Sequence, residues 1–442
     1  MTTHLAGGPS TIRNSSTRRA FVQSAGTAAA LLLAGKSLAG GSGSAVVSTA
    51  VAATGDGGIA PVPPACPHPF LTPAEEFYDV SRGTPRPHSL TGAARADARL
   101  TPETWRLEIT ADPFVEPPNI KTPATLEHPR TLADGTAIDL PMLRELGSKH
   151  EVHFLKAIQC LNLSNPLGQG LWTGVPLRDV LLHCGKMANV RRIYYWGFHN
   201  SDPKQVFQSS VSYTQAMETP PGELPVFLAY QLNGEPISPL RGGPVRMVVP
   251  WAHGFKSIKW LQHIYLTNDF RANDSYANSN NDPESFLKTA AYLDSAPEKF
   301  KSGEPVVLTG QVICGLSGLK HVEYWIREVG EKPTVLADDS PELLRGPWTP
   351  CELYGPPDWD TVLPKGMTPK SILGFDKKTG QPVSWPLRYS MAAFHTTLRS
   401  LKPGRYEVRV RAVDLNGFAQ PEPRPAQKTG KNAIQLRRLW VE

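Results

Sequence analysis

The residues best suited to chemistry lie in one run, GGPVRMVVPWAHGFKSIKWL, at residues 242–261. A glycine-proline approach leads into a short strand that carries Arg246, and a glycine loop then carries Lys256 and Lys259, three residues apart. A guanidinium binds phosphate oxygens through two parallel hydrogen bonds, and an ammonium acts as a point charge. The spacing therefore predicts a cradle for an anion such as phosphate. The alternative is a set of solvated charges on an ordinary hairpin.

Cysteine is the second candidate source of chemistry, and the chain has five: Cys66, Cys160, Cys184, Cys314 and Cys351. Five thiols cannot all pair in an oxidising compartment, so at least one is free or bound to a metal. None of the spacings contains the two close ligand pairs of a zinc site. Cys184 is expected to be a small buried side chain. Whether Cys314 pairs with Cys351 stays open.

Three segments together resemble the sulfite oxidase family of molybdopterin-dependent oxidoreductases: the strand ending at Cys160, the following LWTGVPLRDVL, and the run at 242–261. The VPW and HGFKSIK motifs are especially similar to those of the bacterial periplasmic branch of that family, which reduces methionine sulfoxide in proteins. The resemblance covers residues 75–442 and implies a molybdenum-molybdopterin cofactor, with one molybdenum per chain. A C-x-x-C-H motif is absent from the sequence, so we expect no haem.

The resemblance also implies roles for particular residues. Cys160 would be the thiolate ligand of the molybdenum, since a soft thiolate suits a redox metal and the ion keeps it deprotonated. A buried structural cysteine is the alternative. The residues of the run at 242–261 that would hold the pterin or its phosphate, or lend charge nearby, are Arg246, Lys256, Ser257, Ile258 and Lys259.

The N-terminal loop is expected to meet the same cofactor. FYD at residues 77–79 resembles the F-Y-E pterin contact of the reductase branch, so Tyr78, Asp79 and Arg82 are candidate cofactor contacts, with a surface charge as the alternative for Arg82. Arg241 stands where sulfite oxidases have a histidine and the reductases an asparagine.

Two histidines lie next to predicted strand ends near the site, His199 and His253. Histidine titrates near neutral pH and suits acid-base work, although a satisfied structural histidine is the alternative for each. The candidate catalytic residues are Cys160, Arg241 and His199.

The residues after the cysteine bear on the substrate. Sulfite oxidases continue with G-N-x-R, whose arginine helps to bind sulfite, whereas this chain continues with Leu161, Asn162 and Leu163. A less cationic pocket favours a neutral or organic substrate, unless Arg241, Arg178 or His153 restores the charge. The resemblance thus implies oxygen-atom transfer at sulfur, as in a sulfite oxidase or dehydrogenase. The alternatives are an S-oxide reductase and a metal-free secreted binding module. The expected partners are a small sulfur-containing substrate and a separate electron carrier, such as a c-type cytochrome or a membrane quinone-linked subunit.

We predict an α+β fold, with a mixed α/β molybdopterin-binding domain of the sulfite oxidase type at residues 76–285. Strands are expected at TWRLEIT, HFLKAIQC, RRIYYWGF, VFLAYQLNGEPI, VRMVVP and KWLQHIYLT, and helices at DLPMLRELG and VPLRDVLLHCG. The second helix should bury one apolar face, made of Val175, Leu177, Val180, Leu181 and Leu182.

Residues 286–442 have a different character. From Pro305 the apolar residues alternate with polar ones in segments separated by turn residues, which is typical of an all-β sandwich. In the clearest strand Tyr406, Val408, Val410 and Ala412 share one face. The resemblance implies an immunoglobulin-like dimerisation domain, and hence a homodimer.

Residues 1–53 have the anatomy of an export signal. Arg18 and Arg19 precede an apolar stretch at 25–34 and a tail of small residues, which is similar to a twin-arginine signal. That pathway exports folded proteins, often with a cofactor, so a periplasmic or otherwise extracytoplasmic location is expected. A proline-rich linker follows at 54–75.

Composition narrows the function classes. The chain is 40% hydrophobic and 19% charged, which suits a folded protein. Its net charge is +6, but residues 1–53 hold four basic residues and no acid, and the remainder has 42 basic against 40 acidic residues. Because nucleic-acid binding requires a basic stripe on the folded part, no nucleic-acid partner is expected.

Overall fold

The computed structural model describes residues 63–112, 122–272, 274–275, 277, 282–294, 297–421 and 432–442. The predicted signal at 1–53 and the first part of the predicted linker lie outside the described residues. Within these ranges no helix is long and apolar enough to cross a membrane.

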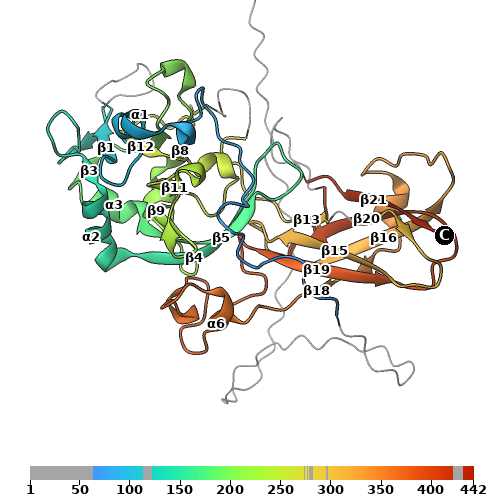
Figure 1. The fold of residues 1–442 in the computed structure, drawn as a ribbon. Helices are drawn as coiled ribbons and strands as arrows, with labels where there is room; N and C mark the ends of the chain where they lie inside the picture. The colour runs from blue at the N-terminus through green and yellow to red at the C-terminus, as the bar shows by residue number, and fades with distance from the viewer. Residues whose placement is uncertain are drawn as a thin grey trace, which may run out of the picture. The chain divides into compact units, whose positions relative to one another are not determined.

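Two sheets with short helices make up the part of the chain that precedes residue 285 (Figure 1). One sheet has the order β3-β1-β12-β7-β8. Its strands are β1 (Arg106–Ala111), β3 (Ile138–Asp139), β7 (Arg192–Gly197), β8 (Gln208–Ser212) and β12 (Leu261–Thr267). The parallel pairing of β1 with β12 joins the two ends of this part of the chain.

The other sheet has the order β10-β9-β5-β4, and β11 also pairs with β9. Its strands are β4 (Val152–Ile158), β5 (Gly168–Pro176), β9 (Phe227–Leu232), β10 (Glu235–Pro236) and β11 (Arg246–Val248). All nine residues of β5 are buried, which shows that both faces of this strand are covered. A two-stranded pair, β2 (Thr125–Leu126) and β6 (Met187–Ala188), completes the strands of this part.

Four short α-helices accompany these sheets: α1 (Gly92–Asp97), α2 (Leu140–His150), α3 (Leu177–Leu182) and α4 (Tyr213–Met217). Helix α2 begins after Asp139, whose side chain accepts a hydrogen bond from Met142 N at 2.9 Å and so satisfies a free amide of the first turn. In α3 the predicted buried face is confirmed at Leu177, Val180 and Leu181. Val175 is buried in β5 and not in the helix, and Leu182 is 57% exposed because one more residue turns it out of the buried face.

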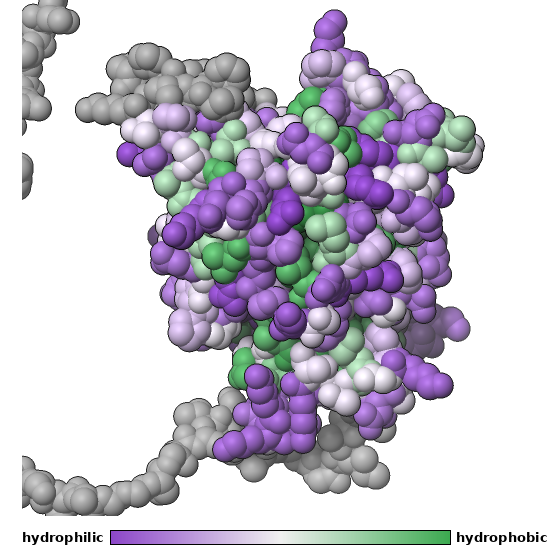
Figure 2. All heavy atoms as spheres, turned by 90° about the vertical axis from the view of Figure 1, so that its left-hand side faces the viewer, coloured by the Kyte–Doolittle hydropathy of each residue, from purple (hydrophilic) through white to green (hydrophobic). Residues whose placement is uncertain are grey.

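The face near α2 and β3 is drawn by hydropathy in Figure 2. Polar side chains dominate it, and apolar side chains lie among them in small patches (Figure 2). It has the mixed character of an ordinary solvent-exposed surface.

The later part of the chain forms two facing sheets, with strand orders β13-β15-β19-β18 and β14-β21-β20-β16-β17. The strands are β13 (Ala290–Leu293), β14 (Lys299–Phe300), β15 (Val306–Ile313), β16 (His321–Val329), β17 (Thr349–Pro350), β18 (Glu352–Leu353), β19 (Met391–Leu398), β20 (Gly404–Val413) and β21 (Gln435–Val441). Helices α5 (Pro341–Arg345) and α6 (Trp359–Val362) lie in the connections.

Side chains from both of these sheets form one apolar core. The predicted inward face of β20 is confirmed, because Tyr406, Val408, Val410 and Ala412 all belong to it. The observed architecture is thus a two-sheet sandwich, and its immunoglobulin-like class stays a prediction.

A second apolar cluster contains residues from both sides of residue 285. It joins Phe154 and Trp172 of the first part to Tyr292, Ile313 and Met391 of the sandwich. The side chain of Gln169, in β5, donates to Met391 O at 3.4 Å and also accepts from Met391 N.

The last residues of the predicted linker contact the same strand. Thr72 N donates to Gln169 O at 2.8 Å, and Gln169 N donates to the hydroxyl of Thr72 at 3.0 Å. The segment is therefore paired with β5 at this point.

The cysteines behave differently in this fold. Cys184 is buried as expected, and Cys314 and Cys351 are both free thiols. Burial raises the pKa of each of these last two to about 12, so they stay protonated at neutral pH.

Candidate active site

A cavity of about 330 Å³ opens where five segments of the described chain meet. They are the N-terminal loop at 77–83, the end of β4 with its following loop, the loop after β7, the approach to β11, and the segment at 254–260. The residues predicted for the site that line this cavity are Tyr78, Arg82, Cys160, His199, Arg241, Arg246, Ser257, Ile258 and Lys259. Asp79 and Lys256 do not line it.

Cys160 lies in the loop after β4, not at the end of the strand as the sequence pattern predicted, because β4 ends at Ile158. Gln159 is buried, and its side-chain amide donates to Cys160 O at 3.2 Å and to Leu163 O at 2.7 Å. Gly254 N donates to Gln159 O at 2.7 Å. The thiol is therefore carried by a loop that is fixed on both sides.

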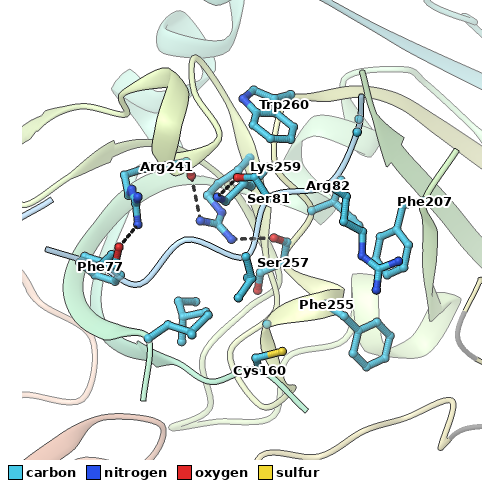
Figure 3. A pocket seen from close by; sticks show the side chains of 18 of the residues that line it. Phe77, Ser81, Arg82, Cys160, Phe207, Arg241, Phe255, Ser257, Lys259 and Trp260 are labelled. Atoms are coloured by element: carbon cyan, nitrogen blue, oxygen red, sulfur yellow. Dashed lines mark hydrogen bonds between the residues drawn. The ribbon is translucent and has the colours of Figure 1, made fainter. Parts of the chain in front are cut away.

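Arg241 and Arg246 are almost fully buried beside this loop. Arg241 Nη1 donates to Phe77 O at 2.6 Å, while Arg246 donates to Arg241 O at 2.9 Å and to Ser257 O at 2.7 Å (Figure 3). Burial, followed by the charge of Arg241, lowers the pKa of Arg246 to about 9, so it remains charged at neutral pH. Each guanidinium keeps one donor, its Nε, without a partner in the described part of the chain.

Lys259 supplies a third cation to the cavity. Its ammonium donates to Asp79 at 2.9 Å, to the hydroxyl of Ser81 at 2.7 Å and to Leu240 O at 2.8 Å. Burial, followed by the charge of Arg246, lowers the pKa of Lys259 to about 7, although Asp79 acts in the opposite direction.

Asp79 holds Lys259 from outside the cavity. Its own burial acts to raise its pKa, but the hydrogen bond from Ser81 and the charge of Lys259 lower that pKa to about 2. Asp79 is therefore a carboxylate at neutral pH, and its contact in this fold is with the lysine.

The structure does not bring Lys256 to the cavity, contrary to the expectation from its spacing. Residues Gly254–Lys256 form a 3-10 turn, and the Lys256 ammonium is buried behind it, where it donates to Ser210 O at 2.6 Å. Asp274 lies 3.8 Å from the same ammonium. The chain changes direction after this turn, so Lys256 and Lys259 face different surroundings.

Of the two candidate histidines, one lines the cavity and the other does not. His199 lines the cavity, and its buried Nδ1 has no hydrogen-bond partner among the described residues. His253 is 2% exposed, does not line the cavity, and is 3.1 Å from Ser285 O through Nδ1. His253 is thus a structural histidine, whereas His199 is placed to meet an occupant.

Several aromatic residues of the cavity were not among the predicted site residues, including Phe207, Phe255 and Trp260. The Arg82 guanidinium lies 4.3 Å from the centre of the Phe207 ring. Figure 3 shows Arg82, Phe207 and Phe255 on the side of the cavity opposite Arg241. Phe255 stands inside the run at 242–261 and could have been found there, whereas no local pattern marks Phe207.

The charged residues lining the cavity are all cationic: Arg82, Arg241, Arg246 and Lys259. No aspartate or glutamate is among the described residues that line it. Cationic groups around an enclosed space attract an anion. No group of three or more histidine, cysteine, aspartate or glutamate side chains in the described ranges is placed to hold a metal ion. A metal at Cys160 would therefore take its other ligands from a bound molecule.

Comparison with known proteins agrees with this geometry. The family model of the oxidoreductase molybdopterin binding domain matches residues 95–275. The NAD(P)H nitrate reductase of Betula pendula is 28% identical over 221 residues, which cover 48% of this chain and 22% of that protein. The inducible NADH nitrate reductase 1 of Glycine max is 35% identical over 102 residues, which cover 22% of this chain and 11% of that protein.

The chain thus spans about a fifth of the length of these curated relatives, or less. Among solved structures, the sulfane dehydrogenase SoxCD of Paracoccus pantotrophus matches with a TM-score of 0.52 at 17% identity, covering 79% of this chain and 82% of that one. At this identity the match shows a shared fold. Residues 95–275 are a molybdopterin-binding oxidoreductase domain, and this match supports the resemblance of the chain to the sulfite oxidase family of molybdopterin-dependent oxidoreductases.

Proposed function

We propose that this chain is an exported molybdenum-molybdopterin oxidoreductase that transfers an oxygen atom at sulfur, in the manner of a sulfite oxidase or dehydrogenase. One observation carries the proposal: a cysteine lies in a cavity whose charged lining residues are all cations. The structural match to a protein named a sulfane dehydrogenase supports sulfur as the reacting element.

The residues present fit the cofactor that the family implies. Cys160 would give the metal its thiolate, and Arg246 and Lys259 would hold an anionic or electron-rich part of the pterin. The unpartnered Nε atoms of Arg241 and Arg246 are buried donors, which such an occupant would satisfy. When bound, the cofactor supplies the two-electron redox chemistry of the reaction.

The remaining side chains of the cavity would orient the substrate and exclude water. His199 keeps its buried Nδ1 without a partner among the described residues, and this atom is available to exchange a proton with the substrate. Phe207 and Phe255 exclude water from one side, and Arg82 offers that side a positive charge. A separate electron carrier and a homodimer joined through the sandwich remain part of the proposal.

An S-oxide reductase is the second candidate, and the substrate side of the cavity favours it. The arginine that sulfite oxidases place after the cysteine is missing, and Leu163 lines the cavity instead. Arg178 and His153 do not line the cavity, so they do not restore that charge, whereas Arg241 does line it. Leu163, Phe207 and Phe255 give the cavity an apolar wall beside its cations, and such a wall suits an organic S-oxide better than a sulfite dianion.

The first experiment counts molybdenum in the folded, exported protein from a host that makes the cofactor. We expect about one molybdenum per wild-type chain, in keeping with a single thiolate position. A Cys160→Ser variant should lose the visible absorption of the thiolate bond, even where the bound pterin still holds the metal. Cys66→Ser is the matched control, because Cys66 is an exposed thiol outside the cavity.

Sulfite and organic S-oxides would then be assayed with artificial electron carriers, to decide between the two candidates. A full-strength absorption band in Cys160→Ser would refute the ligand assignment. Well-folded wild-type protein without molybdenum would instead favour the third reading, a secreted binding module.

A further inference from the structure

Lys156, in the middle of β4, is a fully buried cation that the proposed function does not use. Its side chain is 0% exposed, and it lies four residues before Cys160. Lysine is almost never fully buried unless it is paired with an acid. No ion pair in the described part of the chain includes Lys156.

The contacts of this ammonium are backbone carbonyls. Lys156 Nζ donates to Ala157 O at 2.9 Å and to Ala252 O at 3.3 Å. The residue opposite in β5 is Gly170, and the flanking residues Phe154 and Ile158 belong to an apolar cluster. Among the charged groups of the described residues, Arg246 acts on this ammonium and repels it.

The hydrogen bond to Ala252 O connects the Lys156 ammonium to a loop that lines the cavity. Ala252 precedes the turn that presents Phe255 and Ser257, and two residues further on Gly254 N donates to Gln159 O at 2.7 Å. The loop is thus joined to the end of β4 on either side of residue 253, next to Cys160.

The backbone carbonyl of Lys156 makes a second contact near the cavity, with Trp172. Its indole Nε1 donates to Lys156 O at 3.2 Å, and the Arg246 guanidinium lies 5.1 Å from the centre of the Trp172 ring. The backbone of Lys156 therefore holds the indole that lies beside Arg246, and neither Lys156 nor Arg246 has a carboxylate partner in the described chain.

We propose that Lys156 is a positioning residue for the site at Cys160: its ammonium fixes the Ala252–Gly254 loop against the end of β4 and places a positive charge behind the cavity. An anion bound in the cavity supplies the counter-charge that the empty protein lacks. This inference rests on the proposed function for the identity of that anion, but not for the anion site itself.

Three variants separate the hydrogen bonds from the charge. Lys156→Met keeps the side-chain volume but loses the hydrogen bonds and the charge. Lys156→Gln keeps a hydrogen-bond donor without the charge. Lys156→Arg keeps the donor and the charge. Lys288→Met is the matched control, because Lys288 is another buried lysine that does not line the cavity.

The first readout is the binding of inorganic phosphate to cofactor-free protein at pH 6, measured by calorimetry. Because one buried positive charge is lost, we expect Lys156→Met and Lys156→Gln to bind phosphate about tenfold more weakly than the wild type. Lys156→Arg and Lys288→Met should bind like the wild type.

The second readout is the midpoint potential of the metal centre in cofactor-loaded protein. The loss of a nearby positive charge makes reduction less favourable, so the potential should fall in Lys156→Met and Lys156→Gln and stay in Lys288→Met. Equal phosphate affinity and equal potential in Lys156→Met and the wild type would overturn the inference. If wild-type protein holds no molybdenum, the proposed function fails, and the phosphate measurement still decides the role of Lys156.

Discussion

The unpaired ammonium of Lys156 predicts that replacing it with methionine makes the cofactor-free protein more stable at neutral pH. Burial, followed by repulsion from Arg246, lowers the pKa of Lys156 to about 7. In the unfolded chain a lysine has a pKa of about 10.4. The unfolded state therefore binds this proton more tightly than the folded state, and the folded state loses stability wherever the lysine is charged in the unfolded chain.

The size of the effect follows from the two pKa values. At pH 7 the difference costs the folded protein about 4 kcal/mol, at 1.36 kcal/mol for each pKa unit. Methionine also loses the hydrogen bonds to Ala157 O and Ala252 O, each worth about 1 kcal/mol. We expect Lys156→Met to be about 2 kcal/mol more stable at pH 7. This advantage should shrink as the pH rises, vanish near about pH 9 and reverse by pH 10, where the loss of the two hydrogen bonds outweighs the remaining charge penalty.

Urea unfolding of cofactor-free protein at pH 7 and pH 10, followed by circular dichroism, measures the difference. Lys149→Met is the control, because Lys149 is exposed at the end of α2 and its removal should change stability little at either pH. The reasoning would be refuted by a Lys156→Met protein less stable than the wild type at pH 7. A stability difference that stays constant between the two pH values would refute it equally.

Three further predictions concern the surroundings of the cavity. The pKa of Asp79 is lowered to about 2, so its stabilising contact with Lys259 is present above about pH 4 and is lost as the pH falls toward 2. In Asp79→Asn the free energy of unfolding should therefore depend less on pH between about 4 and 2, which a pH titration of stability would show. Gly243→Ala should destabilise the protein by about 1–3 kcal/mol and lower its molybdenum content, because the added Cβ would stand 1.8 Å from Ile237 O; an unchanged melting temperature would contradict this. Cys66, the exposed thiol, should be alkylated in native protein well before the other cysteines, and mass spectrometry of the labelled peptides would reveal a different order.

The strands could be predicted from the sequence because their signal is local. Alternation every second residue marks β20, and its inward side chains Tyr406, Val408, Val410 and Ala412 are those found in the core. The predicted face of α3 was wrong at both ends, at Val175, which belongs to β5, and at Leu182, which is exposed, since periodicity alone does not show where a six-residue helix begins and ends.

The details of the site depend on contacts between distant segments. Lys256 and Lys259 look equivalent in the sequence, yet a 3-10 turn sends one to Ser210 and the other to Asp79. The pairing of Asp79 with Lys259 joins residues 180 positions apart. The alternation of residues in β4 does not show whether Lys156 faces solvent or the core. Its burial depends on β5 and on the loop at Ala252, which are distant in the sequence.

The apolar cluster shared across residue 285 has a consequence for how the chain comes apart. A fragment that stopped at the polar connection would expose Phe154 and Trp172, which pack against Tyr292 and Met391 in the whole chain. It would also leave the buried amide of Gln169 without its partners on Met391, a costly loss in an apolar setting. The cofactor-binding part and the sandwich therefore share one cooperative unit. Heat or denaturant should melt them together, and the half that holds Cys160 should not survive alone.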